Sequence, residues 1–169
     1  MDESEAKSWV KNKANQDEVV KRFFRDYPPT KTHMAFFMAG IPGSGKTEFA
    51  ENTINALNPK LVPIEHDKLV EYIEGYTPEN YYNFRTAGSA LVSRILKECL
   101  TNGYGFIFDG TLSHPKGQKN IKQTLAKGYS VQVIYIVQDA LIAWDLTKDR
   151  ELVKKRAIER NGFVDTCSK

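Results

Sequence analysis

Cysteine is scarce in this sequence, and its two copies stand far apart. Cys99 and Cys167 form neither a Cys-x-x-Cys pair nor a Cys/His cluster. A disulfide framework and a zinc site are therefore not expected. We expect Cys99 to belong to the core and Cys167 to be a free thiol near the end of the chain.

Long apolar runs and a strong charge of one sign are also missing. No stretch approaches the roughly 18 apolar residues of a membrane span, and residues 1–20 are charged where a secretory signal needs an apolar segment. We therefore expect a cytoplasmic protein with no membrane partner. The net charge of +3 is too small to indicate nucleic acid, although it does not exclude a polyanion.

The sequence does contain an alternation of strand and helix patterns. Short apolar runs predict four buried strands, and amphipathic or glycine-terminated segments predict the helices between them. Such an alternation favours an α/β fold with a mostly parallel sheet of four to five strands, covered on both faces in three αβα layers. The expected strands lie within residues 33–40, 60–67, 104–111 and 130–139, and the helices within 47–58, 67–75, 80–103 and 114–128.

The length of 169 residues suits one domain. We divide this domain, residues 1–169, into an N-terminal helical extension (1–30), a nucleotide-binding core (31–139) and a basic helix (140–162). The extension should hold one or two helices that end at Pro28 and Pro29.

A phosphate-binding loop follows the first expected strand. The segment GIPGSGKT fits the pattern G-x-x-x-x-G-K-[ST], and it stands between an apolar strand and a helix as that motif requires. Its glycines let successive N–H groups turn toward one anion, so a nucleoside triphosphate, ATP or GTP, is the expected ligand. Lys46 should reach the β- and γ-phosphates and Thr47 should hold Mg²⁺. The nucleotide-binding residues are Gly40, Ile41, Pro42, Gly43, Ser44, Gly45, Lys46 and Thr47.

Acidic residues leave the second expected strand in the segment PIEHD. Ligands in open α/β sheets collect beyond the carboxyl ends of the strands. If the second strand neighbours the first, Asp67 lies beside the phosphate loop, where a kinase accepts the proton of an attacking hydroxyl. The alternative is that Asp67 only caps the helix that follows. We interpret His66 as a packed or hydrogen-bonded residue.

The third expected strand ends in FIFDGT, which places Asp109 at the carboxyl edge of the sheet. This carboxylate could hold Mg²⁺ through water, as a Walker B residue does. It could instead bind a substrate hydroxyl or amide together with Thr111. A third alternative is an aspartate that only caps a turn.

The basic helix could act as a lid over the nucleotide. Cations there would stabilise the charge that spreads over the transferred phosphoryl group and would exclude water. Against this, a helical face rich in Lys and Arg is usually only solvated. The basic residues are Lys148, Arg150, Lys154, Lys155, Arg156 and Arg160.

Taken together, these segments resemble the zeta toxin family of P-loop kinases. The resemblance rests on FFMAGIPGSGKTE, IEHD, FIFDGT, KGYSVQVIYIVQDALIAW and TKDRELVKKRAIERNG, and it covers roughly residues 36–162. It implies an ATP- or GTP-dependent, Mg²⁺-dependent kinase that phosphorylates the 3'-hydroxyl of the aminosugar in UDP-N-acetylglucosamine. It also implies a toxin that an antitoxin protein restrains.

The same resemblance implies roles for individual residues. Lys46 and Thr47 match the nucleotide and metal residues, Asp67 matches the base, and Arg150 and Arg160 match the catalytic arginines of the lid. The chain departs from the original toxins in having Asp-Gly-Thr in place of Glu-Gly-Thr at 109–111, and in a shorter spacing between the two arginines. The strand and helix that the family's fold expects after the lid are absent, as in a short form or a fragment.

Two further functions stay open on the sequence. The same core could serve a polynucleotide kinase or another metabolite kinase. It could also be a nucleotide-binding partner module with little or no catalysis.

Overall fold

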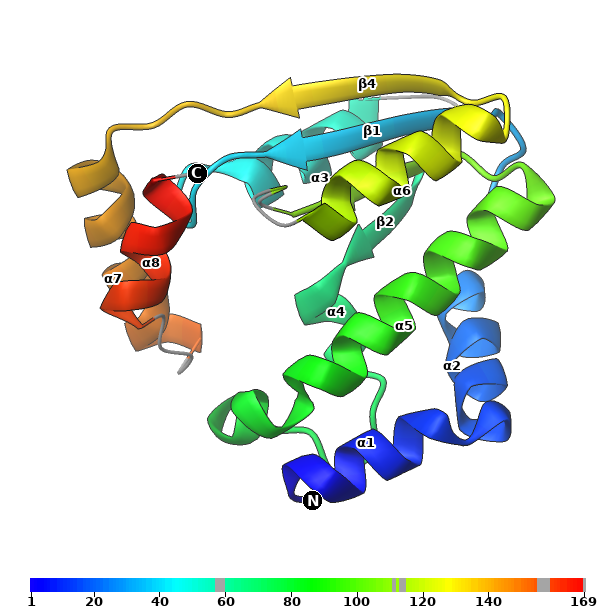
Figure 1. Ribbon diagram of the computed structural model, residues 1–169, viewed down its shortest axis with the longest axis horizontal. Helices are drawn as coiled ribbons and strands as arrows, with labels where there is room; N and C mark the ends of the chain where they lie inside the picture. Colours follow the sequence, from blue (N-terminus) through cyan, green and yellow to red (C-terminus); the bar gives the residue numbers. More distant parts are fainter. Residues whose placement is uncertain (57–59, 111, 113–114, 155–158, 169) are drawn as a thin grey trace.

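The computed structural model describes residues 1–56, 60–110, 112, 115–154 and 159–168, and it forms an α/β fold (Figure 1). The strands are β1 (Met34–Ala39), β2 (Val62–Glu65), β3 (Phe106–Asp109) and β4 (Ser130–Tyr135). The helices are α1 (Glu3–Lys11), α2 (Lys13–Asp26), α3 (Lys46–Ala56), α4 (His66–Val70), α5 (Tyr81–Asn102), α6 (Pro115–Ala126), α7 (Ala140–Lys154) and α8 (Arg160–Cys167), with a 3₁₀ turn η1 (Pro78–Asn80).

The four strands form one parallel sheet, as the sequence predicts. Their order is β2-β3-β1-β4, with Phe37 of β1 paired with Phe108 of β3 and with Val133 of β4. Since β3 lies between β1 and β2, the expectation that the second strand directly neighbours the phosphate-loop strand is wrong. The carboxyl end of β3 is instead the neighbour of that loop.

Helices cover both faces of the sheet, which gives the three layers expected from the alternation (Figure 1). On one face α3 packs against Phe36, Met38 and Ile107. On the other face the buried sheet residues Phe37 and Phe106 join the apolar sides of α2 and α5 in the larger core. Burial on both faces explains the continuous apolar runs of β1 and β2 and of the first half of β3. The expectation of a buried strand is wrong for β4, whose residues are exposed or half-buried, with Val133 53% exposed.

The N-terminal helices pack on α5 and contribute to the larger core. Ala6 of α1 and Phe23 of α2 are fully buried there. A capping box formed by Asp2 and Glu5 starts α1, and Arg94 of α5 binds Asp17 at 3.2 Å. The extension therefore shields one side of the long helix α5.

The basic segment at 140–162 does not form one helix, contrary to the expectation. Helix α7 ends at Lys154 and α8 begins at Arg160, after Glu159 with extended backbone. Helix α8 packs on α7, because Phe163 of α8 is buried and its ring lies edge-on to that of Trp144 of α7, with ring centroids 5.1 Å apart. Within the described residues, no helix is both long and apolar enough to span a membrane.

Candidate active site

The phosphate loop joins β1 to α3 at the carboxyl edge of the sheet. Gly40, Gly43 and Gly45 have φ values of 139°, 78° and 88°, a region that residues with a Cβ rarely adopt. These conformations let the chain turn sharply into α3 with its N–H groups facing one side. The glycine spacing of the motif thus has a direct conformational cause.

Two polar side chains of this loop are buried. Ser44 is 6% exposed, and its hydroxyl oxygen has no hydrogen-bond partner among the described residues. The Nζ atom of Lys46 donates a 2.7 Å hydrogen bond to the carbonyl oxygen of Ile41, across the loop. Burial lowers the pKa of Lys46, and the carboxylate of Asp109 opposes this effect. A buried hydroxyl without a partner and a partly desolvated ammonium group fit an anionic ligand such as a phosphate.

Asp109 stands at the end of β3, where it meets the phosphate loop. Its Oδ2 accepts a 2.9 Å hydrogen bond from the hydroxyl of Thr47. Burial raises the pKa of this carboxyl group, while the Thr47 hydrogen bond and the charge of Lys46 hold it down. Thr111, the expected third residue at this strand end, lies outside the described residues.

The donor set at this point fits a magnesium ion. A threonine hydroxyl and a carboxylate supply oxygen ligands, which Mg²⁺ prefers, and protein sites for this ion commonly use one or two carboxylates plus phosphates and water. In the described part of the chain, no group of three or more His, Cys, Asp or Glu side chains could hold a metal by itself. A metal at Thr47 and Asp109 would therefore need the nucleotide to complete its coordination.

Asp67 is the second residue of α4, and it does not cap that helix. Glu65 occupies the N-cap position, and it makes no side-chain capping bond. The capping alternative for Asp67 is therefore wrong. Its Oδ1 accepts a 3.2 Å hydrogen bond from the hydroxyl of Tyr81, and its negative charge contributes to the raised pKa of Asp109. The two carboxylates thus act on each other at neighbouring strand ends.

His66 serves the packing between α4 and α5. Its Nε2 lies 2.9 Å from the carbonyl oxygen of Arg85, and its Nδ1 lies 3.4 Å from the Tyr81 hydroxyl oxygen. Gly88 of α5 allows this approach, because a Cβ there would lie 2.7 Å from Nε2 of His66. The hydrogen-bonded role expected for His66 agrees with these contacts.

A cavity of about 210 Å³ opens beside Asp109. Its walls combine apolar side chains with several polar groups, so it could hold a small polar molecule. Asp109 therefore faces both the phosphate loop and this second space. The lining residues are His66, Ser89, Val92, Phe108, Asp109, Gly110, Leu112, Lys116, Gly117 and Asn120.

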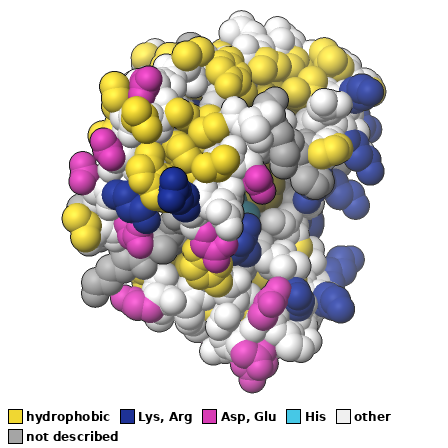
Figure 2. Space-filling model, turned by 60° about the vertical axis from the view of Figure 1, so that its left-hand side comes forward, with side chains coloured by type: hydrophobic (Ala, Val, Ile, Leu, Met, Phe, Trp, Pro, Cys, Tyr) yellow, Lys and Arg dark blue, Asp and Glu magenta, His cyan; other side chains and the backbone are white. Residues whose placement is uncertain are grey.

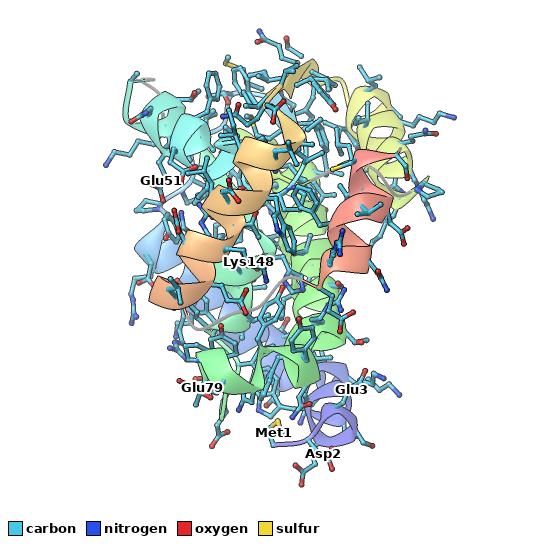
Figure 3. All side chains as sticks on the ribbon, turned by 90° about the vertical axis from the view of Figure 1, so that its left-hand side faces the viewer. Met1, Asp2, Glu3, Glu51, Glu79 and Lys148 are labelled. Carbon is cyan, nitrogen blue, oxygen red and sulfur yellow. The ribbon has the colours of Figure 1, made fainter. Side chains whose placement is uncertain are left out.

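Helix α7 lies directly on the phosphate loop and faces the viewer in Figure 3, where Lys148 is labelled on it. A Cβ on Gly43 would run into the carbonyl oxygen of Ala143, and both Ala143 and Thr147 are buried. From the same helix, Arg150 donates a 2.7 Å hydrogen bond to Oε1 of Glu48. A second cavity, of about 440 Å³, lies between the loop and these side chains. The expected lid is thus packed against the loop.

The second lid arginine has a different position. Arg160 is exposed at the start of α8, and no described contact brings it to the phosphate loop. Lys155 and Arg156 lie outside the described residues, and so does the side chain of Lys154. Of the two expected arginines, only Arg150 has a described contact at the loop.

The sequence reasoning missed two partners in this site. Glu48 follows the phosphate-loop motif directly, and its place in the first turn of α3 could have drawn attention to it. Tyr81 lies 14 residues after Asp67 in the sequence, and no local pattern points to it.

The sequence model of the Zeta toxin family matches residues 17–168. The chain belongs to the Zeta toxin family. The resemblance seen in the sequence is therefore confirmed, and none of the curated proteins gives a significant match to this zeta-toxin chain.

Two solved structures share the fold. A chain from the PezAT chromosomal toxin–antitoxin system of Streptococcus pneumoniae superposes with a TM-score of 0.72 at 18% identity, over 84% of this chain and 65% of that one. A chain from the AvrRxo1-ORF1:-ORF2 complex gives a TM-score of 0.55 at 14% identity, over 85% of this chain and 48% of that one. The present chain therefore spans less than two thirds of either solved chain.

Proposed function

We propose that this zeta-toxin chain is a kinase that transfers the γ-phosphate of ATP or GTP to a hydroxyl group of a small molecule. The observation that carries this proposal is the position of Asp109. It accepts a hydrogen bond from Thr47 of the phosphate loop, and it also lines the separate cavity of about 210 Å³. A nucleotide on the loop and an acceptor in that cavity would meet at this carboxylate.

In the proposed transfer, the side chains at the carboxyl edge of the sheet have different roles. The acceptor hydroxyl gives its proton to Asp67 as its oxygen attacks the γ-phosphorus. The new oxygen–phosphorus bond forms while the bond to the β–γ bridging oxygen breaks, and the nucleoside diphosphate leaves. Lys46 and Arg150 stabilise the charge on the phosphates. Thr47 and Asp109 would hold a Mg²⁺ ion, which supplies charge neutralisation at the β- and γ-phosphates.

Three assignments rest on the family resemblance. UDP-N-acetylglucosamine, or a related sugar nucleotide, is the proposed acceptor, with Asp109 and Thr111 as its binding residues. Arg160 is the proposed second arginine of the lid. The protein is proposed to act as a toxin restrained by an antitoxin, and the likeness to a chain from a toxin–antitoxin system supports this proposal.

Mass spectrometry of acceptors tests the proposed function. The protein, ATP and Mg²⁺ should add one phosphate to UDP-N-acetylglucosamine and none to its analogue that lacks the 3'-hydroxyl of the sugar. Phosphorylation of a 5'-hydroxyl oligonucleotide instead would favour a polynucleotide kinase. ATP binding without transfer to any acceptor would favour a non-catalytic partner module.

Asp67→Asn tests the proposed base. This variant should keep its affinity for ATP and lose at least a hundredfold in transfer rate, since general base catalysis contributes about 10²–10⁴-fold. Asp165→Asn, at an exposed position on α8, is the matched control and should transfer normally. Unchanged transfer by Asp67→Asn would exclude this role for Asp67. Growth arrest of a bacterial host by the wild type but not by Asp67→Asn would support the toxin assignment.

A further inference from the structure

A groove of about 730 Å³ runs between α5 and α6 on the face of the sheet opposite α3. It is larger than either cavity at the candidate active site. Both helices lie on this face in Figure 1. The residues that line the groove are Ser93, Leu96, Lys97, Leu100, Thr101, Lys116, Lys119, Asn120, Gln123, Ala126 and Lys127.

The lining residues follow helical spacing on both walls. On α5 they begin at Ser93 and recur at steps of three and four residues up to Leu100, and on α6 they do the same from Lys116 to Gln123. One face of each helix therefore borders the groove. At a rise of about 1.5 Å per residue, residues 93–101 and 116–127 give walls roughly 12 and 16 Å long. That length matches two to three turns of a third helix laid between α5 and α6.

The floor of the groove is apolar and its rim is basic. Leu96, Leu100 and Ala126 supply carbon surface, whereas none of the described residues that line the groove is acidic. Among the described residues, Lys97 and Lys119 have no ion pair, in contrast to Lys68 or Lys148 elsewhere in the chain. In Figure 2, Lys and Arg side chains gather along the right-hand edge of the molecule, the side on which α6 lies in Figure 3.

We propose that the groove binds an acidic amphipathic helix of a partner protein. Apolar side chains of that helix, spaced at i, i+3 or i+4 and i+7, would cover Leu100 and Ala126, and carboxylates beside them would meet the lysines of the rim. A nucleic-acid strand fits less well, because the floor is apolar and the described rim residues include lysines but no arginine. The proposal uses none of the catalytic roles assigned above.

Selection from a displayed library of random 16-residue peptides tests this proposal. Sequences enriched on the wild-type protein should carry several carboxylates next to apolar residues in helical spacing. Synthetic copies should protect backbone amides of 93–101 and 116–127 from hydrogen exchange. Enrichment of peptides without acidic residues, or protection elsewhere, would overturn the proposal.

Charge reversal on the rim supplies the second test. Lys97→Glu combined with Lys119→Glu should weaken the binding of a selected peptide at least tenfold by fluorescence anisotropy. Lys122→Glu, an exposed position on α6 outside the groove, should change it less than twofold, and circular dichroism should show both proteins folded. If the double variant and Lys122→Glu weaken peptide binding equally, the proposal is overturned. It is also overturned if a single-stranded oligonucleotide displaces the labelled peptide at a lower concentration than the unlabelled peptide does.

Discussion

The hydroxyl of Thr47 donates a 2.9 Å hydrogen bond to Oδ2 of Asp109, although 62 residues separate the two in the sequence. This contact links the start of α3 to the end of β3, the strand next to β1 in the sheet. It brings together the two side chains that the sequence assigns to the nucleotide loop and to the third strand end.

Removal of the Thr47 hydroxyl should reduce the effect of Mg²⁺ on the affinity for ATP. Mg²⁺ should raise the affinity of the wild type for ATP by some factor. In Thr47→Val this factor should be at least tenfold smaller, because one oxygen ligand of the ion is gone. The half-buried carboxylate of Asp109 also loses a donor, which should lower the free energy of unfolding by about 0.5–1.5 kcal/mol. Calorimetric titration with ATP, with and without Mg²⁺, measures the first effect. Thr47→Ser keeps the hydroxyl and should behave as wild type, and an unchanged metal dependence in Thr47→Val would contradict the assignment.

Glu48 should compete with the nucleotide for Arg150. Their ion pair of 2.7 Å is partly exposed, with the Glu48 side chain 62% accessible, so it contributes at most about 1 kcal/mol to stability. We expect Glu48→Gln to bind ATP severalfold more tightly and to unfold at nearly the same denaturant concentration. Glu51→Gln, on the same helix but paired with Lys68, should leave ATP affinity unchanged.

A double-mutant cycle checks whether the effect of Glu48→Gln on ATP affinity depends on Arg150. In an Arg150→Ala background, Glu48→Gln should no longer raise ATP affinity. If Glu48→Gln still raises ATP affinity by the same factor in that background, the Glu48 carboxylate acts on the phosphates directly. The proposed competition for Arg150 would then be wrong.

Gly43 should be needed for the docking of α7 on the phosphate loop. An added methyl group would collide with the carbonyl oxygen of Ala143, whereas at Gly45 it would meet no atom of the described residues within 4 Å. Since both glycines have positive φ, both alanine variants carry backbone strain, and only Gly43→Ala carries the collision. Hydrogen exchange of 140–154 should therefore accelerate in Gly43→Ala and not in Gly45→Ala. Equal exchange in both variants would show that α7 does not depend on this contact.

Phe163 should hold α8 against α7. Its ring is 5% exposed and lies on Trp144, and truncation of a buried phenylalanine typically costs about 3–5 kcal/mol. We expect Phe163→Ala to release α8, which would speed proteolysis within 159–168 and shift the fluorescence of Trp144 to longer wavelength. Val164→Ala, at an exposed neighbour, is the control. Protection of α8 in Phe163→Ala equal to that in wild type would contradict this role.

Local patterns predicted the strands and most helices because each is encoded in contiguous residues. The apolar run before Gly40 forms a buried strand as expected, and the run before Asp109 forms a strand whose first two residues are buried. The long helix α5 ends at Asn102 as expected, with Gly103 in the left-handed conformation. The strand order was not encoded in this way, since it depends on which helices cover each face.

The candidate site was also only partly predictable from the sequence. The phosphate loop was readable from glycine spacing, because the backbone conformation of each glycine is a local property. The Tyr81–Asp67 and Glu48–Arg150 contacts were not readable, because each joins elements that meet only after the helices pack on the sheet. The packing of α8 on α7 was not readable either, because it is made by a tertiary contact, that of Phe163 with Trp144.

The sequence by itself determined a parallel α/β sheet with a phosphate loop at its edge, because hydrophobic periodicity and glycine spacing act within short segments. Only the tertiary structure decided that β3 stands between β1 and β2, so that Asp109 meets Thr47 directly. It alone also brought one face of α5 and one face of α6 to the same groove. Such relations arise when distant segments bury their apolar surfaces together, and no local pattern contains them.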